Sequence, residues 1–178
     1  MKKYQASTPN AEIIGAALKP YYSAITHNDF KHILEQYDLN EIDPEQWYPQ
    51  QLTLDVQKRI FQGEGGSQNL VAIGMKIIDD AIFPPMNSLE EAVNAFASSY
   101  PMNFRNQSAD DLIHAEFVDA QNIRVVNGSP HSDDMIYGYI YGLVRRFREE
   151  NKSFSVEYED ISKRDSDEDT VFIVHYGT

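Results

Sequence analysis

The chain contains no cysteine among its 178 residues. Disulfides, Cys-ligated zinc, iron–sulfur clusters and thiol catalysis are therefore excluded. Basic residues are also scarce, with 15 lysines and arginines against 28 acidic residues and a formal net charge of −13. Nucleic acids and anionic lipid surfaces bind clustered lysine and arginine, so this balance argues against both as partners.

Long hydrophobic runs are missing as well. No segment approaches the roughly 18 apolar residues that a membrane helix needs, and no signal-peptide core follows the lysines near the N-terminus. We therefore expect a cytoplasmic protein in which residues 1–10 are flexible and residues 11–178 form a single domain. The hydrophobic content of 42% is enough for a core.

Apolar residues recur at helical spacing through the first hundred residues. The pattern predicts five helical segments, over residues 11–26, 28–37, 49–61, 67–80 and 88–100. Pro20 lies inside the first of them and predicts a kink or a break there. Ser88 and Glu91 have the spacing of a capping box, which marks the beginning of the last one.

After residue 110 the spacing changes to that of strands. Strands are expected at 112–118 and 122–126, then a helix from Ser132 or Asp133 to about Glu150, then strands near 154–161 and 171–176. Two hairpins joined by one long helix favour an antiparallel sheet with that helix on one face. The predicted fold class is α+β, with N-terminal helices packed on a C-terminal four-stranded antiparallel sheet of β-β-α-β-β order.

No pattern of catalytic or metal-ligating residues stands out. The five histidines lack the spacing of a metal site. Asp165, Asp167 and Asp169 match the start of an EF-hand loop, but Thr170 and Tyr176 stand where glycine and glutamate are required, which favours a solvated turn. The run His131-Ser132-Asp133-Asp134 places acids at a helix start, where they suit the helix dipole without catalysis. We therefore expect no catalytic residue and no metal site, and an enzyme is disfavoured.

Two clusters combine aromatic and polar side chains. One is Trp47-Tyr48 at a helix entrance, and the other is Tyr100-Pro101-Met102-Asn103-Phe104-Arg105 between the helices and the sheet. Small-molecule pockets use aromatics with a few placed polar groups. The candidate ligand-binding residues are therefore Trp47, Tyr48, Tyr100, Met102, Asn103 and Arg105. The alternative is that the aromatics fix the helix entry and that Arg105 pairs with an acid.

The same clusters resemble a bacterial family. The resemblance spans residue 40 to the C-terminus. It is carried by the segment from Ile42 to Gln51, the Phe83-Pro84-Pro85 stop, the Tyr100-x-Met102-Asn103-x-Arg105 run, Asn127-x-x-Pro130 and the helix from Gly138 to Phe147. These proteins look related to haem nitric-oxide-binding (H-NOX) domains and to the 4-vinyl reductase domain. That superfamily has N-terminal helices and an antiparallel sheet.

The resemblance implies a non-enzymatic small-molecule-binding or sensory domain, whose ligand would be small and apolar or tetrapyrrole-like. It does not extend to a haem-binding site in this chain. The chain has no Tyr-x-Ser-x-Arg propionate motif, none of its histidines aligns with the proximal ligand, and Phe104 stands where relatives have histidine. The cofactor is therefore unknown, and haem is possible without a recognisable ligand. The alternatives are a dimeric protein-interaction module with no ligand and a haem or tetrapyrrole protein.

Overall fold

The computed structural model describes residues 3–39 and 41–177 of the chain. The first part is mainly helical, with α1 (Gly15–His27), α2 (Lys31–Gln36), α3 (Gln50–Phe61), α4 (Gly66–Asp80) and α5 (Leu89–Ser99). The second part contains β4 (Ile113–Asp119), β5 (Asn122–Asn127), α6 (Asp133–Phe147), β6 (Phe154–Tyr158) and β7 (Thr170–Tyr176). The predicted α+β class and the β-β-α-β-β order are confirmed.

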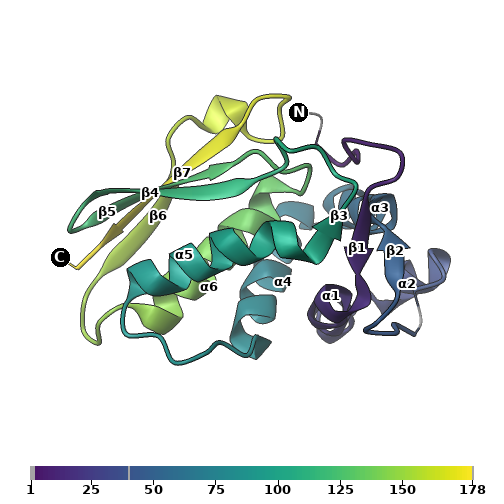
Figure 1. Cartoon of the computed structure of the whole chain (residues 1–178), viewed down its shortest axis with the longest axis horizontal. Helices are drawn as coiled ribbons and strands as arrows, with labels where there is room; N and C mark the ends of the chain where they lie inside the picture. The colour runs from purple at the N-terminus through teal and green to yellow at the C-terminus, as the bar shows by residue number, and fades with distance from the viewer. Residues whose placement is uncertain (1–2, 40, 178) are drawn as a thin grey trace.

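The large sheet has the strand order β4-β5-β7-β6, with every neighbouring pair antiparallel. In Figure 1, α5 and α6 run along one face of this sheet, while α1, α2 and α3 gather at the other end of the molecule. Apolar side chains of β5 and β7 pack against α6 through Ile123, Val125, Phe172, Val174, Ile136 and Ile140. This core holds α6 against the sheet.

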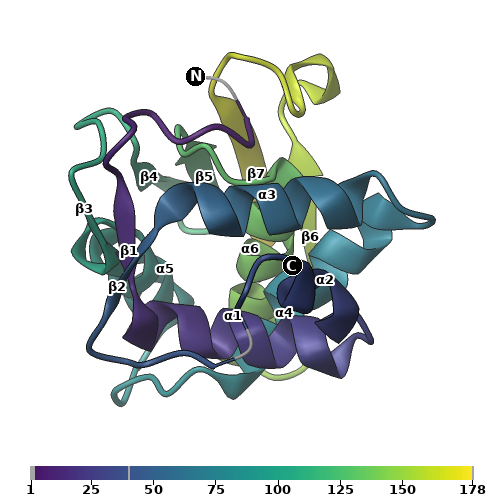
Figure 2. The same cartoon turned by 90° about the vertical axis from the view of Figure 1, so that its right-hand side faces the viewer.

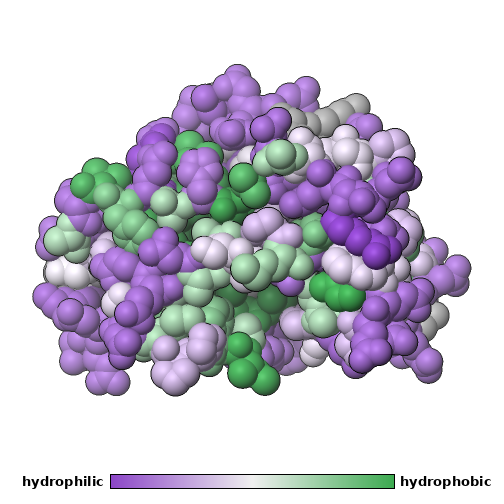
Figure 3. Space-filling model, in the orientation of Figure 1, coloured by the Kyte–Doolittle hydropathy of each residue, from purple (hydrophilic) through white to green (hydrophobic). Residues whose placement is uncertain are grey.

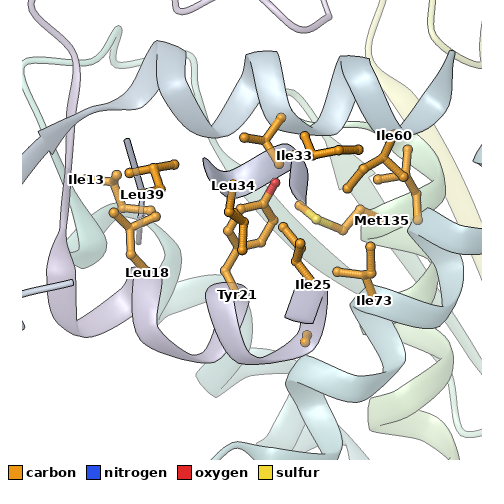
Figure 4. Packing of buried hydrophobic residues seen from close by; sticks show 13 residues of the cluster. Ile13, Leu18, Tyr21, Ile25, Ile33, Leu34, Leu39, Ile60, Ile73 and Met135 are labelled. Carbon is orange, nitrogen blue, oxygen red and sulfur yellow. The ribbon is translucent and has the colours of Figure 1, made fainter. Parts of the chain in front are cut away.

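A second core joins the N-terminal helices to the start of α6. Figure 4 shows Tyr21 and Ile25 of α1 facing Ile60 of α3, Ile73 of α4 and Met135 of α6. The Tyr21 hydroxyl donates to the Thr53 carbonyl oxygen at 3.1 Å.

Helices α4 and α6 touch backbone to backbone. A Cβ atom added to Gly74 would lie 2.3 Å from the carbonyl oxygen of Met135, and one added to Gly138 would lie 2.3 Å from that of Val71. No side chain fits in either place, so glycine is required at both positions. This contact fixes the spacing between the N-terminal helices and the sheet layer.

A small second sheet was not expected from the sequence. It consists of β1 (Glu12–Ile14), β2 (Trp47–Pro49) and β3 (Phe104–Arg105), in the order β2-β1-β3. Figure 2 shows β1 and β2 at one side of the molecule, where they lead into α1 and α3. Strands of two or three residues are too short to give an alternating pattern, which explains why they were missed.

Other expectations about the first helices need correction. The first helix begins at Gly15 and not near residue 11, because residues 12–14 form β1. It does not break at Pro20 but continues to His27. Ser88 caps this helix as expected, since its Oγ accepts from the Glu91 amide at 3.2 Å. The Glu91 carboxylate accepts from the Asn87 amide at 2.8 Å, one residue before the position that a capping box uses. The helix expected to reach about Glu150 ends at Phe147.

The described residues near the N-terminus lie against the body of the protein. Lys3 Nζ is 3.0 Å from the Asp133 carboxylate, the Tyr4 amide donates to the Pro130 carbonyl oxygen at 2.8 Å, and the Ala6 amide donates to Gln51 Oε1 at 2.9 Å. These contacts fall within residues 1–10, for which the sequence predicted flexibility; residues 1 and 2 lie outside the described part. No helix within 3–39 or 41–177 is both long and apolar enough to cross a membrane.

Candidate functional site

A cavity of about 440 Å³ lies between α1, α5, α6 and the segment that follows α4, with further wall residues from α3 and α4. Its walls include Ala17 and Tyr21 of α1, Ala95 and Phe96 of α5, and Met135 and Tyr139 of α6. Ile82, in the segment after α4, lines the cavity and is fully exposed, so the cavity opens to solvent at that end. Hydrophobic residues gather on the surface over and below α5 on the face seen in Figure 3.

The lining is uncharged. Among the described residues that form it there is no aspartate, glutamate, lysine or arginine, although the chain carries 28 acids and 15 bases. Two of its polar side chains lie close to His131: Gln57, which is hydrogen-bonded to it, and Tyr100, whose ring packs beside it. Such a lining suits an apolar molecule that has few polar atoms.

His131 is held in one tautomer by Gln57. The Ser132 amide donates to Gln57 Oε1 at 2.9 Å, which orients the amide group so that Gln57 Nε2 faces His131 Nδ1 at 2.8 Å. Nδ1 must therefore accept this hydrogen bond. The imidazole proton consequently lies on Nε2.

Two buried polar atoms at the cavity wall have no partner in the described structure. His131 Nε2 makes no hydrogen bond, and the hydroxyl of Tyr100 makes none of ordinary geometry; burial raises the pKa of Tyr100, and the nearby Ser129 side chain opposes that rise. The rings of these two residues lie 6.0 Å apart, edge to face. A buried donor without an acceptor costs about 1–3 kcal/mol, and both atoms are closed off by the surrounding protein, with less than 1 Å² of accessible surface each.

His131 is a neutral side chain at physiological pH. Burial, followed by the positive charge of Lys3, lowers the pKa of His131 to about 3. The Lys3 ammonium is itself paired with Asp133 at 3.0 Å, so it is not free to receive an anion.

This pKa shift predicts acid sensitivity. The folded-state pKa lies below the value of about 6.5 expected in the unfolded chain, so between these values the unfolded state binds more protons and stability falls as the pH falls. Lowering the pH from 7 to 5 should cost about 2 kcal/mol through His131 alone. Urea unfolding at both pH values should show that loss in the wild type and a loss about 2 kcal/mol smaller in His131→Phe. Equal losses in the two proteins would contradict the assignment.

The six sequence-predicted site residues fall into two groups. Tyr100 and Asn103, in the 3-10 turn η1 (Tyr100–Asn103), line the cavity. Trp47, Tyr48, Met102 and Arg105 are not among its lining residues, and Met102 is 76% exposed.

The small sheet nevertheless brings the two clusters together. The guanidinium of Arg105 stacks on the Trp47 ring at 4.5 Å from its centroid, and Arg105 Nε donates to Glu12 at 2.6 Å. That hydrogen bond lowers the pKa of Glu12. Tyr48 instead accepts from the Asp43 amide at 2.9 Å through its hydroxyl.

The residues that sequence reasoning missed are His131 and Gln57. His131 was noted only as part of an acidic helix start. Its partner precedes it by 74 residues, so no local spacing could reveal the pair. The following acids are also buried: Asp133 pairs with Lys3, and Asp134 pairs with Arg164 at 2.6 Å.

Groupings suited to a metal ion do not occur in the described part of the chain, where no three His, Asp or Glu side chains come together as ligands. Asp165 of the EF-hand-like run lies instead beside the buried acids, and its amide donates to Asp133 Oδ2 at 2.7 Å. Burial raises the pKa of the Asp165 carboxyl.

Known structures share this fold. No protein-family model matches the chain, and no curated protein matches it in sequence. An H-NOX protein from S. oneidensis in the Fe(II)NO ligation state is similar over 93% of this chain and 100% of its own, with a TM-score of 0.63 and 9% identity. A variant of Tt H-NOX is similar over 93% of this chain and 96% of its own, with a TM-score of 0.68 and 12% identity. A mutant Fe(II) unliganded H-NOX protein from K. algicida has a TM-score of 0.62 at 12% identity, covering 93% of this chain and 97% of its own. The H-NOX-like fold that the sequence resemblance implied is thereby confirmed.

Proposed function

We propose that this chain is a non-enzymatic small-molecule-binding domain of the sensory kind, and that its ligand occupies the cavity between α1, α5 and α6. One observation carries the proposal: a cavity of about 440 Å³ with an uncharged lining in a chain of net charge −13. Its volume lies within the roughly 300–1,000 Å³ typical of ligand pockets. The H-NOX-like fold supports the same reading, because ligand binding is the property named for its solved relatives.

Haem is the first ligand to consider, since solved proteins of this fold include one in an Fe(II)NO state and one described through its distorted porphyrin. The cavity residues do not fit it. An imidazole ligates iron through an unprotonated nitrogen, whereas Gln57 holds the proton on His131 Nε2. The two carboxylates of a haem also need cationic partners, and the described lining has none.

A haemin titration tests this exclusion. We expect only the broad absorption of free haemin, with no sharp Soret band that stays with the protein through gel filtration. A stoichiometric Soret band would contradict the exclusion of haem and show that the protein binds it.

Filling the cavity tests the site. Ala95→Trp places a large ring in a residue that lines the cavity, whereas Ala97→Trp changes a half-buried alanine of the same helix that is not part of the lining. With the neutral dye prodan as the probe, we expect a blue-shifted emission with wild type and Ala97→Trp, and an affinity at least tenfold weaker with Ala95→Trp. Equal binding by all three proteins would place the dye elsewhere and contradict the proposal.

A homodimer without a ligand is the second candidate. The edge strand β4 exposes Phe117 and Val118, with 40% and 58% of their surface accessible. An exposed apolar edge is a feature of surfaces that pair with another chain. Sedimentation equilibrium of the wild type and of Val118→Lys would decide it: we expect a monomer in both, and a wild-type dimer that the substitution dissociates would favour this alternative.

A further inference from the structure

We propose that residues 3–11, the N-terminal strap, hold two walls of the cavity together, so that ligand binding and closure of the strap favour each other. The inference rests on the proposed function and adds to it a means of regulation, since any event that lifts the strap would weaken binding. The attachments at the two ends of the strap carry the argument.

At its C-terminal end the strap continues directly into one wall. It leads at Glu12 into β1 and at Gly15 into α1, and Ile13, Ala17 and Leu18 of these elements line the cavity. Strand β1 is paired on both edges, with β2 and with β3. Figure 2 shows the strap running across the top of the view, above α3, before it turns down into β1 and α1. The position of the strap is therefore tied to that of the α1 wall.

At its N-terminal end the strap is bonded to the backbone that leads into a second wall. Lys3 Nζ donates to the Ser129 carbonyl oxygen at 2.9 Å, and the Tyr4 amide donates to the Pro130 carbonyl oxygen at 2.8 Å. The next residue, His131, lines the cavity, and α6, which also contributes lining residues, begins two positions later. The strap thus fixes the backbone immediately before the α6 wall.

The middle of the strap contacts two further elements. The Ala6 amide donates to Gln51 Oε1 of α3 at 2.9 Å, and Gln51 Nε2 donates back to the Tyr4 carbonyl oxygen at 3.1 Å. The Ser7 hydroxyl donates to the Asp111 carboxylate, ahead of β4. The strap itself contains no helix or strand, so it can open and close while the elements below it stay folded.

The buried ion pair between Lys3 and Asp133, at 3.0 Å, does not prevent the strap from opening. When the strap lifts, the ammonium passes into water, and the Asp133 carboxylate keeps hydrogen bonds from Asn127, Thr170 and the Asp165 amide. Neither charge is then buried without any partner, unlike in a variant that removes one of them. The closed strap is therefore a state that can be left reversibly.

A ligand in the cavity would contact both walls, so it binds best when both are in place. With the strap open, the α1 wall and the backbone before α6 lose a shared attachment and can move apart. A ligand that prefers the closed state shifts the strap toward closure, and by linkage a change that opens the strap lowers the affinity by the same factor. Such couplings usually amount to roughly 5-fold to 150-fold, and we expect about tenfold here.

Hydrogen exchange in the unmutated protein tests the coupling, with prodan as the probe. The amides of Tyr4 and Ala6 are both hydrogen-bonded to the body of the protein, so each exchanges when the strap opens. We expect saturating prodan to slow their exchange about tenfold. The Gln121 amide, which donates to Asp119 Oδ1 at 2.8 Å in the turn between β4 and β5, is the internal control and should change less than twofold. Equal exchange of the Tyr4 and Ala6 amides with and without bound prodan would overturn the inference.

Lys3→Met tests the coupling in the other direction, and Lys19→Met, which changes an exposed lysine of α1, is its matched control. We expect prodan to bind Lys3→Met about tenfold more weakly than wild type, and Lys19→Met within twofold of wild type. Wild-type affinity in a folded Lys3→Met would overturn the inference and leave the cavity site standing. If Lys3→Met does not fold, the exchange measurement decides alone. Failure of prodan to bind even the wild type would overturn the proposed function as well.

Discussion

Replacing Asp133 with alanine is expected to lower the free energy of unfolding by about 4 kcal/mol. Its carboxylate is fully buried at the first residue of α6. It accepts from Asn127 Nδ2 and Thr170 Oγ1 at 2.8 Å each and from the Asp165 amide at 2.7 Å, and it pairs with Lys3 at 3.0 Å. The substitution would leave the buried Lys3 ammonium without its counter-ion, although it still donates to the Ser129 carbonyl oxygen at 2.9 Å. It would also take away an acceptor from three donors, of which Thr170 Oγ1 keeps the Lys163 carbonyl oxygen at 3.3 Å. Breaking a buried pair in this way costs more than the pair itself contributes.

Urea unfolding would measure the loss, with Asp79→Ala as the control. Asp79 pairs with Arg145 at 2.6 Å, but both side chains are about two-fifths exposed, at 44% and 40%. An exposed pair contributes about 0.5 kcal/mol. Similar losses in the two variants would mean that the buried network at the start of α6 adds nothing beyond a surface ion pair.

Gly138→Ala is expected to cost about 3 kcal/mol. Its new Cβ would lie 2.3 Å from the Val71 carbonyl oxygen and 3.1 Å from Gly74 Cα. These are backbone atoms, so α4 and α6 must move apart. Because Tyr139 follows directly and lines the cavity, the same substitution should also weaken prodan binding.

The control for this prediction is Gly63→Ala. A Cβ at Gly63 would lie 3.3 Å from its nearest neighbour, the Ile60 carbonyl oxygen, so a change below about 1 kcal/mol is expected. Thermal unfolding of both variants, with prodan titrations beside it, would check the difference. Equal midpoints would show that α4 and α6 can separate without cost.

The elements that sequence reasoning found are those with many apolar repeats. The pattern of Ile136, Ile140 and Val144 predicted α6, and alternation predicted β5 and β7, because each of these elements buries one full stripe. The strands β1, β2 and β3 were not predicted, because their pairing depends on residues far apart in the sequence, such as Glu12 and Arg105. Their short lengths carry no period of their own.

The residues of the candidate site also differ in whether a local sequence pattern could point to them. Tyr100 and Asn103, predicted as ligand-binding residues from a short run of mixed aromatic and polar residues, line the cavity. The sequence places His131 only in an acidic helix start, since the amide that gives it a fixed tautomer belongs to Gln57 of α3. The burial of Asp133 was missed for a related reason: its cation, Lys3, lies 130 residues earlier. Contacts of this kind become visible only once the helices are placed.

The pairing of β1 with β3 also has a consequence in time. During synthesis on the ribosome, Glu12 emerges 93 residues before its partner Arg105. At ribosomal speeds of 5–20 residues per second that interval lasts roughly 5–20 s. During it, β1 can pair with β2 while its other edge stays open, and the cavity still lacks the walls that α5 and α6 will supply. The cavity is therefore among the last parts of the nascent chain to form, and the proposed ligand would stabilise only a chain whose synthesis has passed α6.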